Sequence, residues 1–156
     1  MNEIDINQYL ILDQFVKQIY RGVISSNELF KIDKSVKSLY IVNTDPNYLP
    51  GSHWICIYSQ GEICEIFDSL GNNPKEYSKH FTNLMQEYEK CIYSTVKLQS
   101  VSSNLCGIYC IFYCYLKSRG FELYEILNTF SENTQMNDYL MKNFLDRVHE
   151  LHSNTS

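Results

Sequence analysis

The sequence has no long apolar run, and it is poor in glycine and proline. No stretch approaches the roughly 18–20 consecutive apolar residues that a membrane-spanning helix requires. Only 6 of the 156 residues are Gly and 3 are Pro, which excludes collagen-like and linker-dominated chains. Hydrophobic residues at 44% and charged residues at 20% exclude wholesale disorder. A chain of this length is expected to form one domain over residues 1–156.

Positive charge is also scarce. Thirteen Lys and Arg stand against 18 Asp and Glu, for a net charge of −5, and no basic run occurs. Binding of nucleic acid through its phosphates is therefore disfavoured. Residues 1–5 are acidic and lack the basic start and apolar middle of a signal peptide, so we expect synthesis in the cytosol without export.

The six cysteines include no Cys-x-x-Cys pair. A disulfide framework is typical of shorter, secreted chains, so reduced thiols are expected. Cys106, Cys110 and Cys114 share helical spacing, and three thiols on one face of one helix cannot surround a zinc ion. We therefore expect no metal cofactor.

Apolar periodicity predicts an α+β fold, with a small central mixed β-sheet packed by helices. Helices are predicted over residues 6–20, 74–90, 106–119, 121–127 and 136–151, with a short turn at 28–32 capped by residues 25–27. Strands are predicted over residues 38–43, 53–58, 63–68 and 95–99, with a hairpin turn at 59–62. Arg21-Gly22 and Gly120 are expected to end helices, and residues 153–156 to form a polar tail. The helix over 106–119 is apolar nearly all round and should be the central buried helix.

Cys106 opens this predicted helix, after a polar turn at residues 101–104. Unpaired amides and the helix dipole at such a position stabilise a thiolate over a thiol. The same amides can hold an oxyanion that forms on a carbonyl carbon, and Gly107 is expected to let a substrate backbone approach. The alternative is that Cys106 is a small core residue, as we expect for Cys110 and Cys114.

A nucleophilic thiol needs a base and a group that orients the base. His53 begins an apolar strand after a turn, whereas His80, His149 and His152 lie on polar helical or tail positions. Asp68 closes the strand that the hairpin pairs with the strand of His53, so the two side chains are expected to be neighbours. The alternative for Asp68 is a turn-forming residue before Ser69.

Gln99 is predicted to end the fourth strand, just before the turn that leads to Cys106. Its side-chain amide is placed to donate a hydrogen bond to the same oxyanion. By itself it is also an ordinary polar strand residue.

These residues together resemble the adenovirus-type cysteine proteases (the adenain family) and the wider clan that includes the SUMO-specific proteases. The resemblance rests on Gly51-Ser52-His53-Trp54, Ile66-Phe67-Asp68-Ser69-Leu70-Gly71, Gln99 and Cys106-Gly107-Ile108-Tyr109-Cys110, in the clan's order of His, acid, Gln and Cys. It covers about residues 38–119. Leu105 stands where SUMO proteases usually have Asp, which favours the viral or virus-like transposon branch.

The resemblance implies a role for each matching residue. His53 matches the general base, Asp68 the acid that orients it, and Cys106 the nucleophile. Gln99 and the backbone amide of Cys106 match the oxyanion hole. Gly51, Trp54 and Gly107 are expected to contact the substrate.

The function implied is a thiol endopeptidase acting on viral or virus-like precursor proteins, with small residues such as Gly near the cleavage site. The alternatives are an isopeptidase that removes ubiquitin-like modifiers and an acyltransferase on the same fold.

The resemblance also implies an activating peptide linked to a cysteine. Cys91 is the nearest position for that link, and the alternative is that Cys91 is a plain thiol. The acidic charge disfavours the family's DNA activator. We expect no other cofactor, no membrane partner, a monomer, and a location in the host cytoplasm or nucleus or packaged in the virion.

Overall fold

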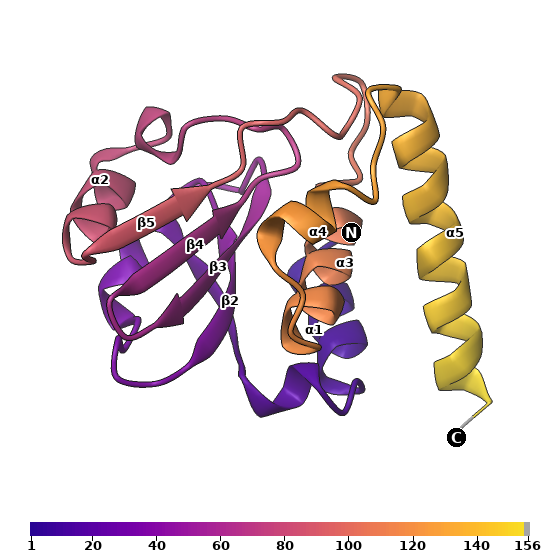
Figure 1. The fold of residues 1–156 in the computed structure, drawn as a ribbon, viewed down its shortest axis with the longest axis horizontal. Coiled ribbons are helices and arrows are strands. Elements are labelled where there is room, and N and C mark those ends of the chain that lie inside the picture. Colours follow the sequence, from indigo (N-terminus) through magenta and orange to yellow (C-terminus); the bar gives the residue numbers. More distant parts are fainter. Residues whose placement is uncertain (155–156) are drawn as a thin grey trace.

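The structure is a computed structural model that describes residues 1–154 of the 156-residue chain (Figure 1). Five strands form one sheet: β1 (Tyr20–Ser25), β2 (Ser38–Asn43), β3 (Trp54–Gln60), β4 (Ile63–Phe67) and β5 (Lys90–Tyr93). The α-helices are α1 (Glu3–Ile11), α2 (Lys79–Gln86), α3 (Cys106–Ser118), α4 (Leu123–Leu127) and α5 (Thr134–Ser153). Three short 3-10 helices are η1 (Val16–Gln18), η2 (Ser26–Lys31) and η3 (Pro74–Glu76).

The sheet is mixed, and its strands follow one another in sequence order. The three central strands β2, β3 and β4 pair antiparallel, whereas the edge strands β1 and β5 pair parallel to β2 and β4. The α+β class with a mixed sheet is therefore confirmed. No helix within residues 1–154 is both long and apolar enough to cross a membrane.

Helices cover both faces of the sheet. In β3, Cys56 packs into the cluster shared with α1 and α3, while Ile55 and Ile57 pack into a second cluster shared with η2 and α2. Burial on both faces explains why this strand reads as a continuous apolar run. In Figure 1, α3, α1 and α4 lie against one face of the sheet, α2 lies beyond the other, and α5 is outermost.

Several predicted elements are confirmed. β2 has the predicted bounds, a hairpin turn at residues 61–62 joins β3 to β4, and α3 begins at Cys106 and ends just before Gly120. Of the predicted turn over 59–62, Ser59 and Gln60 belong to β3, where they pair with Cys64 and Ile63. The short turn after Ser25 is η2, and the last two predicted helices are α4 and α5. Ser153 belongs to α5 instead of the predicted polar tail, and the end of that tail, residues 155–156, lies outside the described residues.

The prediction of one helix over residues 6–20 is wrong. α1 ends at Ile11 because the Asp13 carboxylate accepts the backbone N–H groups of Phe15 and Val16, at 3.0 and 2.9 Å, in place of continued helical bonds. Arg119 holds that carboxylate in place at 2.7 Å. Arg21 and Gly22 do not end a helix; they belong to β1, whose pairing with β2 is irregular between Tyr20 and Gly22.

The predicted helix over 74–90 and strand over 95–99 are also wrong. The helical segment is divided between η3 and α2, and Lys90 already belongs to β5. Residues 95–99 lie outside the sheet. Instead, the backbone N–H groups of Leu98 and Gln99 donate to the carbonyl of Ser69, at 2.8 and 3.1 Å. The segment predicted as the fourth strand is therefore part of the irregular connection between β5 and α3.

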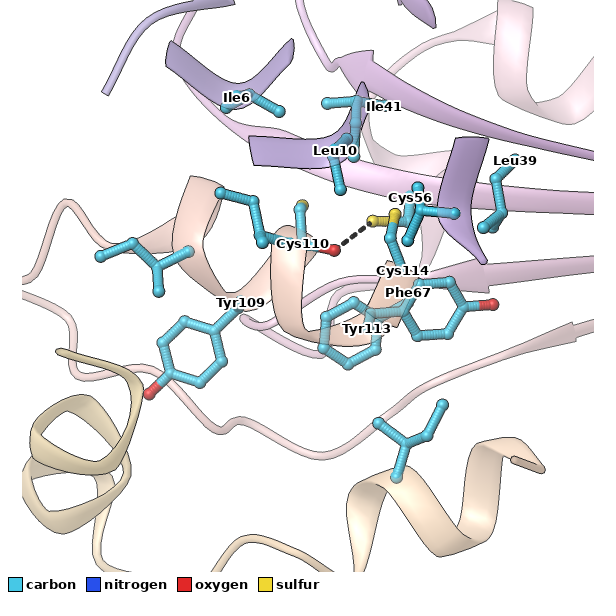
Figure 2. Close-up of a cluster of buried hydrophobic side chains, with 14 of the residues drawn as sticks. Ile6, Leu10, Leu39, Ile41, Cys56, Phe67, Tyr109, Cys110, Tyr113 and Cys114 are labelled. Atoms are coloured by element: carbon cyan, nitrogen blue, oxygen red, sulfur yellow. Dashed lines mark hydrogen bonds between the residues drawn. The ribbon is translucent and has the colours of Figure 1, made fainter. Parts of the chain in front are cut away.

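Figure 2 shows how α3 enters the core. Cys110 and Cys114 point toward Cys56 of β3, whose thiol donates to the Cys110 carbonyl at 3.6 Å, and Tyr113 stacks on Phe67 with ring centroids 4.8 Å apart. Cys110 and Cys114 are fully buried, as predicted for core residues.

A buried ion pair links α3 to the sheet. Lys117 Nζ lies 3.0 Å from Glu65 Oε2 and 4.7 Å from the ring centroid of Tyr58, and the Tyr113 hydroxyl also donates to Glu65. Glu65 is 4% exposed, so removal of its cationic partner leaves a buried charge without compensation.

We expect Lys117→Met to lower the free energy of unfolding by about 3 kcal/mol, because a buried pair broken on one side costs several kcal/mol. Chemical denaturation followed by circular dichroism measures this. Lys31→Met is the matched control, since its pair with Glu28 is exposed and should contribute under about 1 kcal/mol. Equal losses in both variants would contradict the structural role of the buried pair.

Candidate active site

Cys106 is the first residue of α3, and its side chain faces a cleft of about 910 Å³. The N–H groups of the first turn of an α-helix have no intrahelical partner, so this end of α3 favours negative charge. The sequence-based placement of Cys106 at the N-terminus of the buried helix is confirmed. Because the residue is 9% exposed, its sulfur is sheltered from bulk water yet borders the cleft.

His53 immediately precedes β3. Its carbonyl accepts the N–H of Thr44 at 3.0 Å, which extends the β2–β3 pairing by one residue and fixes its backbone. Asp68 immediately follows β4, the hairpin partner of β3. His53 Nε2 donates to Asp68 Oδ1 at 2.6 Å, so the predicted proximity of these residues is confirmed. This bond leaves Nδ1 as the ring nitrogen available to Cys106.

The Asp68 carboxylate is 1% exposed and accepts further hydrogen bonds. The Leu70 N–H donates to Oδ1 at 2.9 Å, and the Tyr77 hydroxyl donates to Oδ2. Asn72 Nδ2 in turn donates to the Tyr77 oxygen at 3.0 Å. Asp68 is therefore more than a turn residue, because its carboxylate collects donors from three separate positions of the chain.

The surroundings shift the pKa values of His53 and Cys106 in opposite directions. Burial opposes charge on His53, but hydrogen bonds to Asp68 and Cys106 outweigh burial and raise its pKa to about 9. Burial likewise opposes charge on Cys106. The hydrogen bond and charge of His53, with the N–H groups of Trp54 and Gly107, outweigh it and lower the pKa of the thiol. The two shifts therefore have the signs that favour a thiolate–imidazolium pair over a neutral thiol and imidazole.

Gln99 lies beside the same cleft, but not at the end of a strand as predicted. Its side chain is 3% exposed and is held at both ends of the amide. The Ser69 hydroxyl donates to Oε1 at 2.6 Å, and Nε2 donates to the Ser103 carbonyl at 2.8 Å. The structure therefore brings Gln99 to the cleft through an irregular connection.

The three residues expected to contact substrate differ in their surroundings. Trp54 and Gly51 line the cleft. Gly51 has φ +90°, and a Cβ there would lie 2.1 Å from Asn43 Nδ2, so only glycine fits. At Gly107 a Cβ would meet Met1 and Ile6 at 3.1 and 3.3 Å, so Met1 and, in α1, Ile6 occupy the space expected to admit a substrate backbone. That expectation for Gly107 is not supported, although its N–H acts on the Cys106 thiol.

The remaining histidines lie away from this cleft. His80 and His149 are exposed, and His152 is half-buried beside Tyr9 and Tyr115. Cys91 of β5 is half-buried opposite Cys64 of β4, and both are free thiols. Over residues 1–154, no three His, Cys, Asp or Glu side chains gather so as to hold a metal ion.

Segments far apart in the sequence form the cleft walls. They are residues 1–3, residues 23–28 of β1 and η2, the loop before β3, and the connection 99–106. Besides His53, the residues with charged side chains that line the cleft are Glu3 and Glu28. The charged side chains of the walls other than His53 are therefore both acidic.

Sequence reasoning missed two residues, Ser69 and Tyr77. Ser69 follows Asp68 directly. A small hydroxyl residue next to a candidate catalytic acid was the feature of the sequence that could have indicated its place in the site. Tyr77 lies in a segment interpreted as helix, one of 13 tyrosines, so no local pattern marked it.

We expect iodoacetamide to alkylate Cys106 at pH 7, and His53→Ala to slow that reaction at least tenfold. Removal of the imidazolium raises the thiol pKa, and one pKa unit reduces the thiolate fraction about tenfold. Peptide mass spectrometry resolves the six cysteines, and Cys91 serves as the internal control because its pKa is lowered by Cys64 and not by His53. Unchanged labelling of Cys106 in His53→Ala would contradict the pairing.

The amino-acid sequence is similar to that of a known protein. The chain is 30% identical over 127 residues to a protein named "Protease" from bovine adenovirus 4, across 69% of this chain and 63% of the relative. It thus spans less than two thirds of the relative's length. No protein-family model matches the chain.

Solved structures with a similar fold include the following two, both at lower sequence identity. The ASFV pS273R protease has a TM-score of 0.43 at 20% identity, over 66% of this chain and 43% of that chain. AvrA delL154 with IP6 and CoA has a TM-score of 0.49 at 16% identity, over 72% of this chain and 48% of that chain. Neither alignment reaches a TM-score of 0.5, so neither decides the fold.

The motifs indicate a resemblance to the adenovirus-type proteases. The sequence match to the bovine adenovirus protease confirms this resemblance.

Proposed function

We propose that the chain is a viral cysteine endopeptidase with Cys106 as nucleophile, His53 as general base and Asp68 as the group that orients His53. The observation that carries the proposal is the hydrogen bond between Asp68 and His53 at 2.6 Å beside a cleft that Cys106 also lines from the N-terminus of α3, with His53 acting to lower the pKa of Cys106. Similarity to an adenovirus protease supports it.

Acylation begins from the thiolate–imidazolium pair. The Cys106 sulfur attacks the carbonyl carbon of the scissile peptide, and the carbonyl π electrons move to oxygen. The side-chain amide of Gln99 and the backbone N–H of Cys106 are proposed to donate to this oxyanion. When the tetrahedral intermediate collapses, the C–N bond breaks and His53 gives its proton to the leaving nitrogen.

Deacylation reverses the proton flow. His53, now neutral, takes a proton from water while the water oxygen attacks the thioester carbon. The C–S bond then breaks, releasing the carboxylic acid and restoring the thiolate beside the imidazolium. Asp68 holds the ring through Nε2 in both half-reactions, so Nδ1 stays directed at the reacting atoms.

The proposed substrates are precursor proteins of a virus or virus-like element, cleaved near small residues such as Gly. The wall formed by Gly51 and Trp54 is proposed to contact the substrate chain on the His53 side of the cleft. An activating peptide linked through Cys91 would meet a half-exposed edge strand, which is compatible with such a partner.

We expect Cys106→Ala and His53→Ala to abolish cleavage of a fluorogenic peptide that ends in Gly-Gly-aminomethylcoumarin. Each removes a group that forms or breaks a bond in the proposed steps. Cys110→Ala, one turn along α3, is the matched control and should retain activity, because that thiol packs in the core. Wild-type turnover in Cys106→Ala would refute the proposal. Trapping of Cys106 by a ubiquitin-like probe without peptide cleavage would favour the isopeptidase alternative.

The pH dependence of kcat/KM should show an alkaline decline near pH 9. His53 has its pKa raised to about 9, and above that pH it no longer holds the proton that the leaving nitrogen needs. The acid limb should lie below the ordinary thiol pKa, because the pKa of Cys106 is lowered. Initial rates between pH 5 and 10 test this, and an alkaline limit below pH 7 would contradict it.

A further inference from the structure

Ser69 connects the two halves of the proposed machinery. It follows Asp68 directly, is 1% exposed, and contacts Gln99 through both its backbone and its side chain. Its carbonyl accepts the N–H of Gln99 at 3.1 Å, and its hydroxyl donates to Gln99 Oε1 at 2.6 Å. The dipeptide Asp68-Ser69 therefore touches both the candidate base and the candidate oxyanion donor.

The contacts on Gln99 determine which end of its amide carries the free donor. The carbonyl of Ser103 can only accept, so it faces Nε2, and Oε1 is left to accept from Ser69. An amide nitrogen carries two hydrogens, and the bond to Ser103 uses one of them. A flipped amide would place two acceptors against each other and offer oxygen to an oxyanion.

The backbone beside Gln99 is anchored from the opposite direction. Asn137 of α5 donates to the Leu98 carbonyl at 3.1 Å, and the hydroxyl of Ser100 donates to Asp138 at 2.7 Å. Both residues of α5 are buried, and Tyr109 of α3 also donates to Asp138 at 2.7 Å. With the backbone held on both sides of Gln99, the orientation of its side chain rests on Ser69 and Ser103.

We propose that Ser69 is a positioning residue that holds the Gln99 amide with Nε2 directed to the oxyanion. This inference rests on the proposed function for its catalytic consequence. Without the Ser69 hydroxyl, Oε1 is a buried acceptor with no partner from that side, and the amide can rotate away from its donating orientation.

The kinetic test is Ser69→Ala with the Gly-Gly-aminomethylcoumarin peptide in single-turnover acylation. We expect about a tenfold loss of acylation rate, the size of one lost hydrogen bond, with KM within about twofold. Alkylation of Cys106 by iodoacetamide should be unchanged, because that reaction forms no oxyanion. Ser59→Ala is the matched control, since its buried hydroxyl bonds Tyr88 at 2.6 Å and does not contact Gln99.

A double-mutant cycle separates positioning from general stability. In a Gln99→Ala background, Ser69→Ala should cause no further loss of acylation rate. The same tenfold loss in both backgrounds, or a loss equal to that of Ser59→Ala, would overturn the inference. Ser69→Thr keeps a hydroxyl and should recover part of the lost rate.

A spectroscopic test does not depend on cleavage. In a nitrogen–proton correlation spectrum, the side-chain amide signals of Gln99, identified by their loss in Gln99→Ala, should move toward free-amide positions in Ser69→Ala and stay in place in Ser59→Ala. Unmoved signals in Ser69→Ala would overturn the inference, whether or not the wild type cleaves the peptide. A wild type that cleaves nothing while these signals move would contradict only the proposed function.

Discussion

The arrangement of the site depends on one buried carboxylate, that of Asp68. A carboxylate at 1% exposure is tolerated only when donors surround it, and here the donors are the His53 ring, the Leu70 N–H and the Tyr77 hydroxyl. These groups come from both sides of the β3–β4 hairpin and from the segment before α2. The hydrogen bonds that satisfy the Asp68 carboxylate therefore hold the ring of His53, and His53 in turn lowers the pKa of the Cys106 thiol.

The candidate site lies where regular structure ends. Cys106 opens a helix, His53 and Asp68 flank a hairpin, and Gln99 stands in a connection without secondary structure. The sheet and α3 form the rigid framework, and the loops bring side chains from separate elements to the same cleft. Close passage of loops requires glycine: a Cβ at Gly71 would lie 2.7 Å from the backbone of Val96, so the segment after β4 can pass directly beneath the connection that carries Gln99.

The mixed sheet also explains which parts of the molecule are coupled. β3 and β4 carry His53 and Asp68 at one end, and Glu65 of β4 pairs with Lys117 of α3, whose other end carries Cys106. α5 stabilises the opposite wall through Asn137 and Asp138. Distant helices therefore contribute to the position of the candidate oxyanion donor, although no residue of α5 lines the cleft.

The sequence by itself determined the elements whose signals are local: β2, the hairpin and α3 are apolar runs bounded by their own turn residues. It also indicated that His53, Asp68, Gln99 and Cys106 share one site, since their order and neighbours match a known family.

Tertiary structure alone decided the remaining features of the fold and of the site. α1 ends where Asp13 meets Arg119, 106 residues away, and Gln99 is held by Ser69 instead of by a strand. β1 and β5 join the sheet edges through pairing with neighbours, and α1 covers Gly107. Each of these outcomes depends on contacts between segments far apart in the chain, which local periodicity does not encode.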